Sequence, residues 1–206
     1  MPIARASVAF VAAVIITFLA NHSTQVGLLV FGGYGVAAGV LVGVLALRTS
    51  PRGIVRALFV AIGALGLVFG AAALALHGGG LEALIALVSA WAVLTGALEL
   101  YAGVRSRKRL AAARDWRAVG VLSLALAVAY LIVPPGLHKH FAGQDGVHGT
   151  LTAAIVLVGI FGAYAAVVCV YWVIGGLSLR WAAVDEARSG GQQDSRDRKA
   201  PDEQPG

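Results

Sequence analysis

The sequence predicts an all-α integral membrane protein, a bundle of six spanning helices with both termini in the cytoplasm. The first observation is hydropathy: the 206 residues are 59% hydrophobic, with a mean hydropathy of +0.83. The second is charge: of the sixteen Lys and Arg residues, all but Lys139 fall in every second gap between apolar runs. Because basic loops are retained on the cytoplasmic side, this alternation sets the expected topology.

Six apolar runs are the expected spans, and most match the roughly 20 residues that cross about 30 Å of hydrocarbon. The runs are Ala6–Ala20, Val26–Leu47, Ala57–Leu76, Leu81–Gly103, Ala118–Val133 and Leu151–Leu179. The first is short, but Pro2 at a helix start and a snorkelling Arg5 extend it. Trp116 and Arg117 extend the short fifth run in the same way. The sixth is too long, so it must tilt, bend near a glycine or run past the membrane face.

Composition excludes several classes of function. Retention of basic residues on the inner side explains the net charge of +6 without a nucleic-acid partner, so the expected partner is the lipid bilayer. Six spans leave no room for a globular catalytic domain. The chain carries no nucleophile elbow, zinc-protease motif or phosphate-binding loop, and the His77–Gly80 segment HGGG is read as a turn. We therefore expect no enzyme activity, no cofactor and no metal.

The expected domain organisation is one membrane domain and a tail. Residues 1–184 hold the six spans. From Asp185 onward the chain is rich in Gly, Gln, Asp, Arg and Pro and has almost no apolar side chains. Such a segment buries too little surface to offset its ordering entropy, so residues 185–206 are expected to be a disordered cytoplasmic tail.

An internal repeat divides the membrane domain into three tandem helical hairpins, 1–48, 57–105 and 116–184. A shift of 57 residues places the pattern Tyr34-x-Val36-x-x-Gly39 on Trp91-x-Val93-x-x-Gly96. A further shift of 80 reaches Tyr171-x-Val173-x-x-Gly176. Each hairpin enters and leaves on the same side, so the copies are parallel rather than inverted.

Three segments carry a resemblance to a known family. They are WAVLTGALELYAGVRSR (Trp91–Arg107), DWRAVGVLSLALAVAYLIVPP (Asp115–Pro135) and YWVIGGLSLR (Tyr171–Arg180). The chain resembles the HdeD-like family of acid-resistance membrane proteins, which are built from a short repeated helical-hairpin domain. Pro134 fits the family pattern of a span ending in Pro outside, whereas the first hairpin has no Pro in its outer turn. The resemblance implies a six-span inner-membrane protein linked to survival of acid stress, with no established catalytic chemistry.

All five histidines lie in the expected outer gaps. They are His22, His77, His138, His140 and His148. Because the unperturbed pKa of His is near 6.5, external acid would add positive charge to this face, which makes the five histidines candidates for pH sensing. A second interpretation is metal binding in the loop that holds His138, His140, Asp145 and His148. The third is that they are solvated loop residues without a special role.

Glu99 is the only acidic residue well inside an apolar run. In the register of the repeat, Arg180 lies at nearly the same depth. A carboxylate and a guanidinium inside a membrane are each costly alone and tolerable as a pair. We therefore expect a Glu99–Arg180 ion pair between the fourth and sixth runs, the alternative being that each side chain snorkels to the interface.

Glycines mark the expected helix contacts. Gly35, Gly39 and Gly43 lie on one face of the second run, and Gly66 and Gly70 on one face of the third. Gly96 and Gly176 are the repeat equivalents of Gly39. Such faces let two backbones approach closely, either inside the bundle or between copies of the chain in a homo-oligomer.

These features predict a non-enzymatic, multi-pass protein of the inner membrane that resembles acid-stress resistance proteins and responds to external pH through its outer histidines. The alternative is a small transporter or channel that uses Glu99 and Arg180 as its polar element. A third interpretation is a scaffold that binds a partner through its basic inner face or tail.

Overall fold

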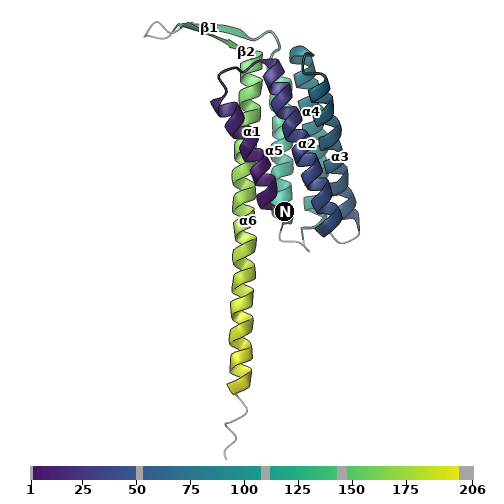
Figure 1. Ribbon diagram of the computed structural model, residues 1–206, viewed down its shortest axis with the longest axis vertical. Coiled ribbons are helices and arrows are strands. Elements are labelled where there is room, and N and C mark those ends of the chain that lie inside the picture. Colours follow the sequence, from purple (N-terminus) through teal and green to yellow (C-terminus); the bar gives the residue numbers. More distant parts are fainter. Residues whose placement is uncertain (1, 50–52, 108–111, 143–147, 200–206) are drawn as a thin grey trace, which may run out of the picture.

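Six helices and one short β-hairpin form the part of the chain that the computed structural model describes, residues 2–49, 53–107, 112–142 and 148–199 (Figure 1). The helices are α1 (Pro2–Phe18), α2 (Thr24–Thr49), α3 (Ile54–Ala75), α4 (Gly80–Arg105), α5 (Ala113–Ile132) and α6 (Ala153–Lys199). All except α1 are long and apolar enough to cross a membrane. With 17 residues α1 is about 25 Å long, slightly less than the hydrocarbon thickness. The predicted all-α bundle is confirmed.

Turn residues set the helix boundaries. Gly80 has a φ of 70°, a left-handed conformation that favours glycine, and this lets the chain reverse between α3 and α4. The HGGG segment is thus a turn, as expected. Val133 is extended, with φ −68° and ψ 119°, because it precedes Pro134, and α5 therefore ends at Ile132.

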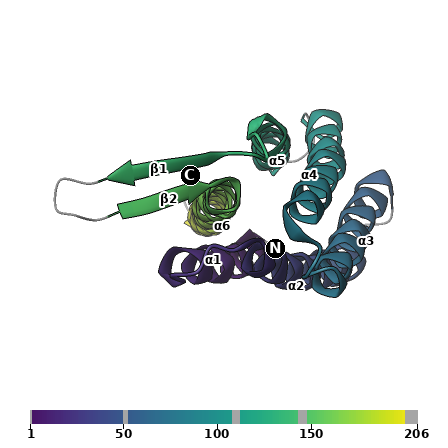
Figure 2. The same ribbon diagram turned by 90° about the horizontal axis from the view of Figure 1, so that it is seen from above.

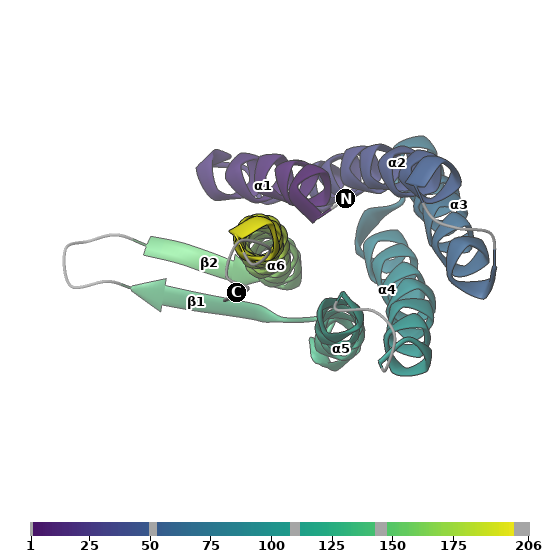
Figure 3. The same ribbon diagram turned by 90° about the horizontal axis from the view of Figure 1, so that it is seen from below.

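The helices form a ring in which sequence neighbours contact one another and α6 closes on α1. The most extensive contacts are α2 with α3, α4 with α5 and α6 with α1. Viewed along the bundle, α1 and α2 lie on one side, α4, α5 and α6 lie opposite, and α3 flanks α2 and α4 (Figures 2 and 3). Each predicted hairpin thus packs mainly on its neighbours in the ring, and α1–α6 is the closing contact.

Burial follows the 57-residue repeat. Ala6, Gly63 and Gly120, each 57 positions apart on α1, α3 and α5, are all buried. Ile16, Ala73 and Tyr130 show the same relation, each at most 3% exposed. Gly63 and Gly120 contact the repeated glycines Gly39 and Gly96 of the preceding helices. A Cβ on Gly39 would stand 2.7 Å from Gly63 O, and one on Gly96 would stand 3.0 Å from Gly120 O.

The third copy differs from the expected register. Tyr164 of α6, and not Tyr171, lines the same central cavity as Tyr34 and Trp91. The shift from α4 to α6 at the centre of the bundle is therefore 73 residues rather than 80. The two registers differ by seven residues, about two helical turns, so both place small and aromatic residues on the same helix face.

The predicted glycine faces pack inside the chain. A Cβ on Gly35 would stand 3.0 Å from Gly66 O and Gly70 Cα, so α2 and α3 meet backbone to backbone. Gly43 forms the end of this contact, since a Cβ on Gly63 would stand 2.8 Å from Gly43 N. Gly176 faces Ile3 of α1. The homo-oligomer expected as an alternative stays a prediction.

Two segments differ from their expected form. The fifth gap, Pro134–Thr150, was expected to be a loop, whereas strands β1 (His138–Ala142) and β2 (His148–Thr152) form there, and β2 reaches two residues into the predicted sixth run. The strands pair antiparallel with His140 opposite Thr150. The tail was expected to be disordered from Asp185, whereas α6 continues as helix to Lys199 and projects alone beyond the bundle (Figure 1). Ala, Glu and Arg are good helix formers and no proline interrupts residues 153–199, so the helical hydrogen bonds continue. Residues 200–206 lie outside the described residues.

Candidate functional site

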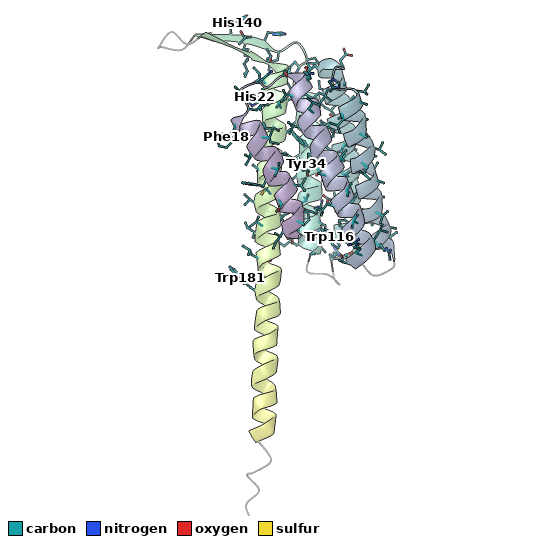
Figure 4. All side chains as sticks on the ribbon, viewed as in Figure 1. Phe18, His22, Tyr34, Trp116, His140 and Trp181 are labelled. Carbon is teal, nitrogen blue, oxygen red and sulfur yellow. The ribbon has the colours of Figure 1, made fainter. Side chains whose placement is uncertain are left out.

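Three helices supply aromatic side chains to the centre of the bundle. Tyr34 of α2, Trp91 of α4 and Tyr164 of α6 occupy equivalent positions, and Figure 4 places Tyr34 at mid-height. The ring centroids of Tyr34 and Trp91 are 5.9 Å apart, and those of Trp91 and Tyr164 are 6.3 Å apart, both edge to face. This arrangement favours contact between the positive edge of one ring and the negative face of the next.

Phe31 and Phe161 pack in the core on the side of these rings that faces the β-hairpin. Phe31 lies 5.4 Å from Trp91 and 5.6 Å from Phe161, measured between centroids, and both phenylalanines are at most 2% exposed. They come one helical turn before Tyr34 and Tyr164. We call five aromatic side chains the aromatic plug (Phe31, Tyr34, Trp91, Phe161, Tyr164). They fill the centre of the bundle, between the end that carries the β-hairpin and the end that carries the N-terminus.

An ion pair lies on the other side of the aromatic plug. The Arg5 guanidinium of α1 donates a hydrogen bond to Oε1 of Glu99 on α4. The side chain of Glu99 is only 3% exposed and that of Arg5 16%. The Arg5 Cζ also lies 4.2 Å from the centroid of the Trp172 ring, a cation–π contact. Glu99 is thus a buried carboxylate whose charge is compensated by the first helix of the chain.

The repeat shows how unusual this pair is. The 57-residue shift places Arg5 on Ile62 and Val119, and the shifts of 57 and 73 place Glu99 on Val42 and Trp172; all of these residues line the same central cavity. The other two copies are therefore apolar at the level where the pair lies. Repetition alone does not account for the charges, so they are an addition to an apolar scaffold.

A small cavity of about 30 Å³ adjoins the pair, and polar groups face it. Ser123 donates to Val119 O at 3.0 Å, so the 2.8 Å contact between the hydroxyls of Tyr164 and Ser123 has Tyr164 as donor. Thr95 donates to Trp91 O at 2.7 Å. The Nε1 donor of Trp91, a residue 6% exposed that lines this cavity, is buried without a hydrogen-bond partner in the described structure. We call this cavity, together with the Arg5–Glu99 pair, the axial chamber. It has space for a water molecule, and the Trp91 Nε1 donor beside it has no partner among the described residues.

Sequence reasoning identified Glu99 and assigned it a different partner. The side chain of Arg180 lies outside the described residues, so the Glu99–Arg180 pair is not visible. Among the described side chains, the cation that contacts Glu99 is Arg5, 94 positions away, which was expected only to snorkel. The available signal was that Arg5 lies inside the first helix rather than in a loop, but its closeness to Glu99 depends on how α1 joins the ring.

The histidines gather at the end of the bundle opposite the N-terminus. His22 precedes α2, His77 lies in the turn before α4, and His138, His140 and His148 belong to the β-hairpin. Figure 4 shows His22 and His140 at this end. His140 Nδ1 lies 2.9 Å from Thr150 Oγ1, and His77 Nδ1 lies 3.0 Å from Leu74 O. His77, His138 and His140 are exposed, whereas the side chain of His148 lies outside the described residues.

Within the described part of the chain no three His, Cys, Asp or Glu side chains group as a metal site. Asp145, which the metal interpretation requires, lies outside the described residues. The arginines lie at the opposite end from the histidines: Arg48 in the last turn of α2, Arg105 in the last turn of α4, and Arg56, Arg114 and Arg117 near the starts of α3 and α5. The two ends of the bundle therefore differ in the kind of basic residue that they carry.

The fold and the apolar helices define a multi-pass membrane protein. Within it, residues 61–132, which cover most of α3 and all of α4 and α5, match the family described as a short repeat of unknown function (DUF308). The matched segment includes Glu99 and the Gly96–Gly120 contact. No curated protein and no solved structure matches the chain.

Proposed function

We propose that this chain is a non-enzymatic inner-membrane protein that supports survival of acid stress and responds to external pH through its histidine-bearing end. The observation that carries the proposal is the separation of residues along the bundle. All five histidines lie at one end, and the described helix-terminal arginines lie at the other. A membrane retains the arginine end in the cytoplasm, which directs the histidines outward.

Protonation gives this arrangement a physical effect. Imidazole gains a positive charge as the medium becomes mildly acidic, whereas Arg and Lys are charged throughout. The outer end carries His77, His138 and His140 exposed to solvent, beside Lys139. In acid the charge on this face becomes more positive, which increases electrostatic repulsion within the β-hairpin. The resemblance to acid-resistance proteins motivates the acid-stress part of the proposal, whereas the family match of residues 61–132 is to a short repeat of unknown function.

The test compares two five-histidine variants in a strain that lacks the gene. His→Gln at all five positions removes the titratable charge, whereas His→Arg keeps it permanently positive. We expect the Gln variant to survive acid no better than the deletion strain, and the Arg variant to lose the dependence on pH. Equal membrane levels of both proteins are the control. Full acid survival with the Gln variant would refute the proposal.

Topology is tested separately by cysteine labelling. Cys169 is the chain's only cysteine and is 9% exposed, so a Cys169→Ser background leaves no thiol. A cysteine placed at position 138 should react with an impermeant reagent in intact cells, and one placed at position 105 only after permeabilisation. The reverse result would place the histidines in the cytoplasm.

The second candidate function is a small transporter, and the Arg5–Glu99 pair favours it. A buried ion pair in a membrane protein marks a substrate or ion pathway by default. The aromatic plug closes the axis on one side of the pair, so transport would need these rings to move. If the protein is a transporter, Glu99→Gln should abolish substrate uptake into proteoliposomes. If it is an acid-stress protein that acts through its histidines, the same variant should leave acid survival unchanged.

A further inference from the structure

The axial chamber has the composition of a cation-binding site. One carboxylate, Glu99, lines this cavity together with the aromatic residues Tyr34, Trp91, Tyr164 and Trp172. Aromatic rings around a carboxylate bind weakly hydrated organic cations, because the ring quadrupole attracts the charge and little hydration is lost. Charged side chains that face the chamber are limited, in the described structure, to Arg5 and Glu99.

Arg5 already occupies this site. Its guanidinium contacts Glu99 through a hydrogen bond and lies 4.2 Å from the Trp172 ring centroid. These are the two contacts that a free guanidinium-type cation would make. We propose that the axial chamber is a binding site for a small organic cation with a guanidinium group, and that Arg5 is its tethered occupant in the structure.

The size of the chamber makes the two occupants exclusive. The space beside the pair is about 30 Å³, enough for a water molecule. A guanidinium group has four non-hydrogen atoms, so it fits only where Arg5 withdraws. A metal ion is a poor alternative, because divalent cations require several oxygen or nitrogen ligands and Glu99 is the sole carboxylate facing this cavity in the described structure.

Competition follows from the tether. Arg5 is held near Glu99 by α1, whose contact with α6 is among the most extensive in the bundle, so its effective concentration at the site is high. A free cation must displace it, and the wild-type protein should bind guanidinium weakly. Removing the Arg5 side chain removes the competitor and exposes the site.

The first experiment is therefore a chemical rescue of purified full-length Arg5→Ala in lipid nanodiscs. Guanidinium chloride at millimolar concentration should raise the melting temperature of Arg5→Ala by roughly 3–6 °C when it is present at about ten times its Kd. Sodium chloride at the same concentration is the salt control. The Arg5→Ala/Glu99→Gln variant should show no rise, since it lacks the carboxylate.

Trp172 provides a matched pair of variants for the aromatic contact. In the Arg5→Ala background, Trp172→Phe should keep most of the rescue and Trp172→Leu should lose it. The proposal would be overturned if sodium and guanidinium raised the melting temperature equally. It would also be overturned if the Arg5→Ala/Glu99→Gln variant showed the same rise as Arg5→Ala.

A second measurement uses wild-type protein in case Arg5→Ala does not fold. Methylguanidinium should change the tryptophan emission with a saturable dependence on concentration, because it displaces Arg5 from Trp172. Glu99→Gln should abolish this change, and a response of the same size in wild type and in Glu99→Gln would refute binding. The proposal deepens the second candidate function by naming a cation class. Both experiments measure binding without flux, so binding without transport would reject only the transporter.

Discussion

The Arg5–Glu99 pair concentrates the electrostatic cost of this bundle in two side chains. Taking a carboxylate and a guanidinium out of water costs several kcal/mol per ion, and their attraction offsets this only with good geometry. The hydrogen bond and the Trp172 contact supply that geometry. Because the equivalent positions of the other copies are apolar, we expect the pair to have a functional role and not to be required for packing.

Removing one partner should be costly, whereas removing both should not. Arg5→Met leaves the Glu99 carboxylate, 3% exposed, without a cation and should destabilise the protein by about 3–5 kcal/mol. The double variant Arg5→Ile/Glu99→Val places the side chains of Ile62 and Val42 at the equivalent positions. Its free energy of unfolding should lie within about 1 kcal/mol of the wild-type value or exceed it. Unfolding in nanodiscs measures both values.

The comparison also separates stability from function. If the apolar double variant keeps the stability but loses guanidinium binding, the pair serves the axial chamber. A double variant as unstable as Arg5→Met would instead show that the pair is needed to hold the fold.

Half of this site could be predicted from the chain alone. Glu99 stood out because an acid in the middle of an apolar run is rare in membranes. Its partner could not be derived, because residues 94 positions apart meet only when α1 closes the ring. The sequence repeat pointed instead to Arg180, because its shift of 80 residues aligns Gly96 with Gly176. The structure has a shift of 73 residues, which aligns Glu99 with Trp172.

At the scale of elements, α2 and α3 make the most extensive contact of the fold and meet backbone to backbone. Gly35, Gly39, Gly63, Gly66 and Gly70 each stand close to backbone atoms of the opposite helix. In a membrane, packing and not the expulsion of water drives helix association, so close approach is the main source of stability at such contacts. The sequence predicted all of these contact glycines except Gly63, but it left open whether the glycine faces meet inside one chain.

Alanine substitution should separate the packed glycines from the free ones. A Cβ on Gly39 would stand 2.7 Å from backbone atoms of α3, so Gly39→Ala should destabilise the protein by about 1–3 kcal/mol. Gly33 lies on a different face of the same helix, where an added Cβ would have no neighbour within 4 Å. Gly33→Ala should be neutral or stabilise by up to about 1 kcal/mol through helix propensity.

Thermal unfolding of both variants in the same detergent checks this prediction. Equal effects at the two positions would mean that the α2–α3 backbone contact does not limit stability.

The β-hairpin shows where element prediction failed. The fifth gap was expected to be a loop that holds three of the five histidines. The strands form through pairing of His138–Ala142 with His148–Thr152, a contact between separate segments. Propensity of one segment does not report such pairing, since a strand depends on its partner.

At the scale of the molecule, a ring of helices is followed by an isolated helical extension. The ring closes through α1 and α6, the first and last helices, so the bundle is complete only when both are present. Beyond the bundle, α6 continues to Lys199 away from the other helices (Figure 1). Most helical stability comes from packing, so this extension should be the least stable helix in the protein.

Deletion of residues 185–206 should therefore leave the melting temperature of the bundle unchanged. Circular dichroism should lose only the signal of the extension, and hydrogen exchange of residues 185–199 in the full chain should be fast. The matched control is truncation before Trp172, which removes the ring over Arg5 and part of the α1–α6 contact and should lower the melting temperature. A large loss of stability on deleting 185–206 would show that the extension packs on the bundle.

The sequence by itself determined the all-α membrane class, the number of helices, the glycine faces and the burial of Glu99. These follow from hydropathy, small-residue spacing and the cost of charge in lipid, which act locally along the chain. Tertiary structure alone decided the ring closure, the 73-residue register of α6, the pairing of Glu99 with Arg5 and the aromatic axial chamber. Their common physical reason is that each depends on the relative height and rotation of helices distant in sequence, which are set by packing between them.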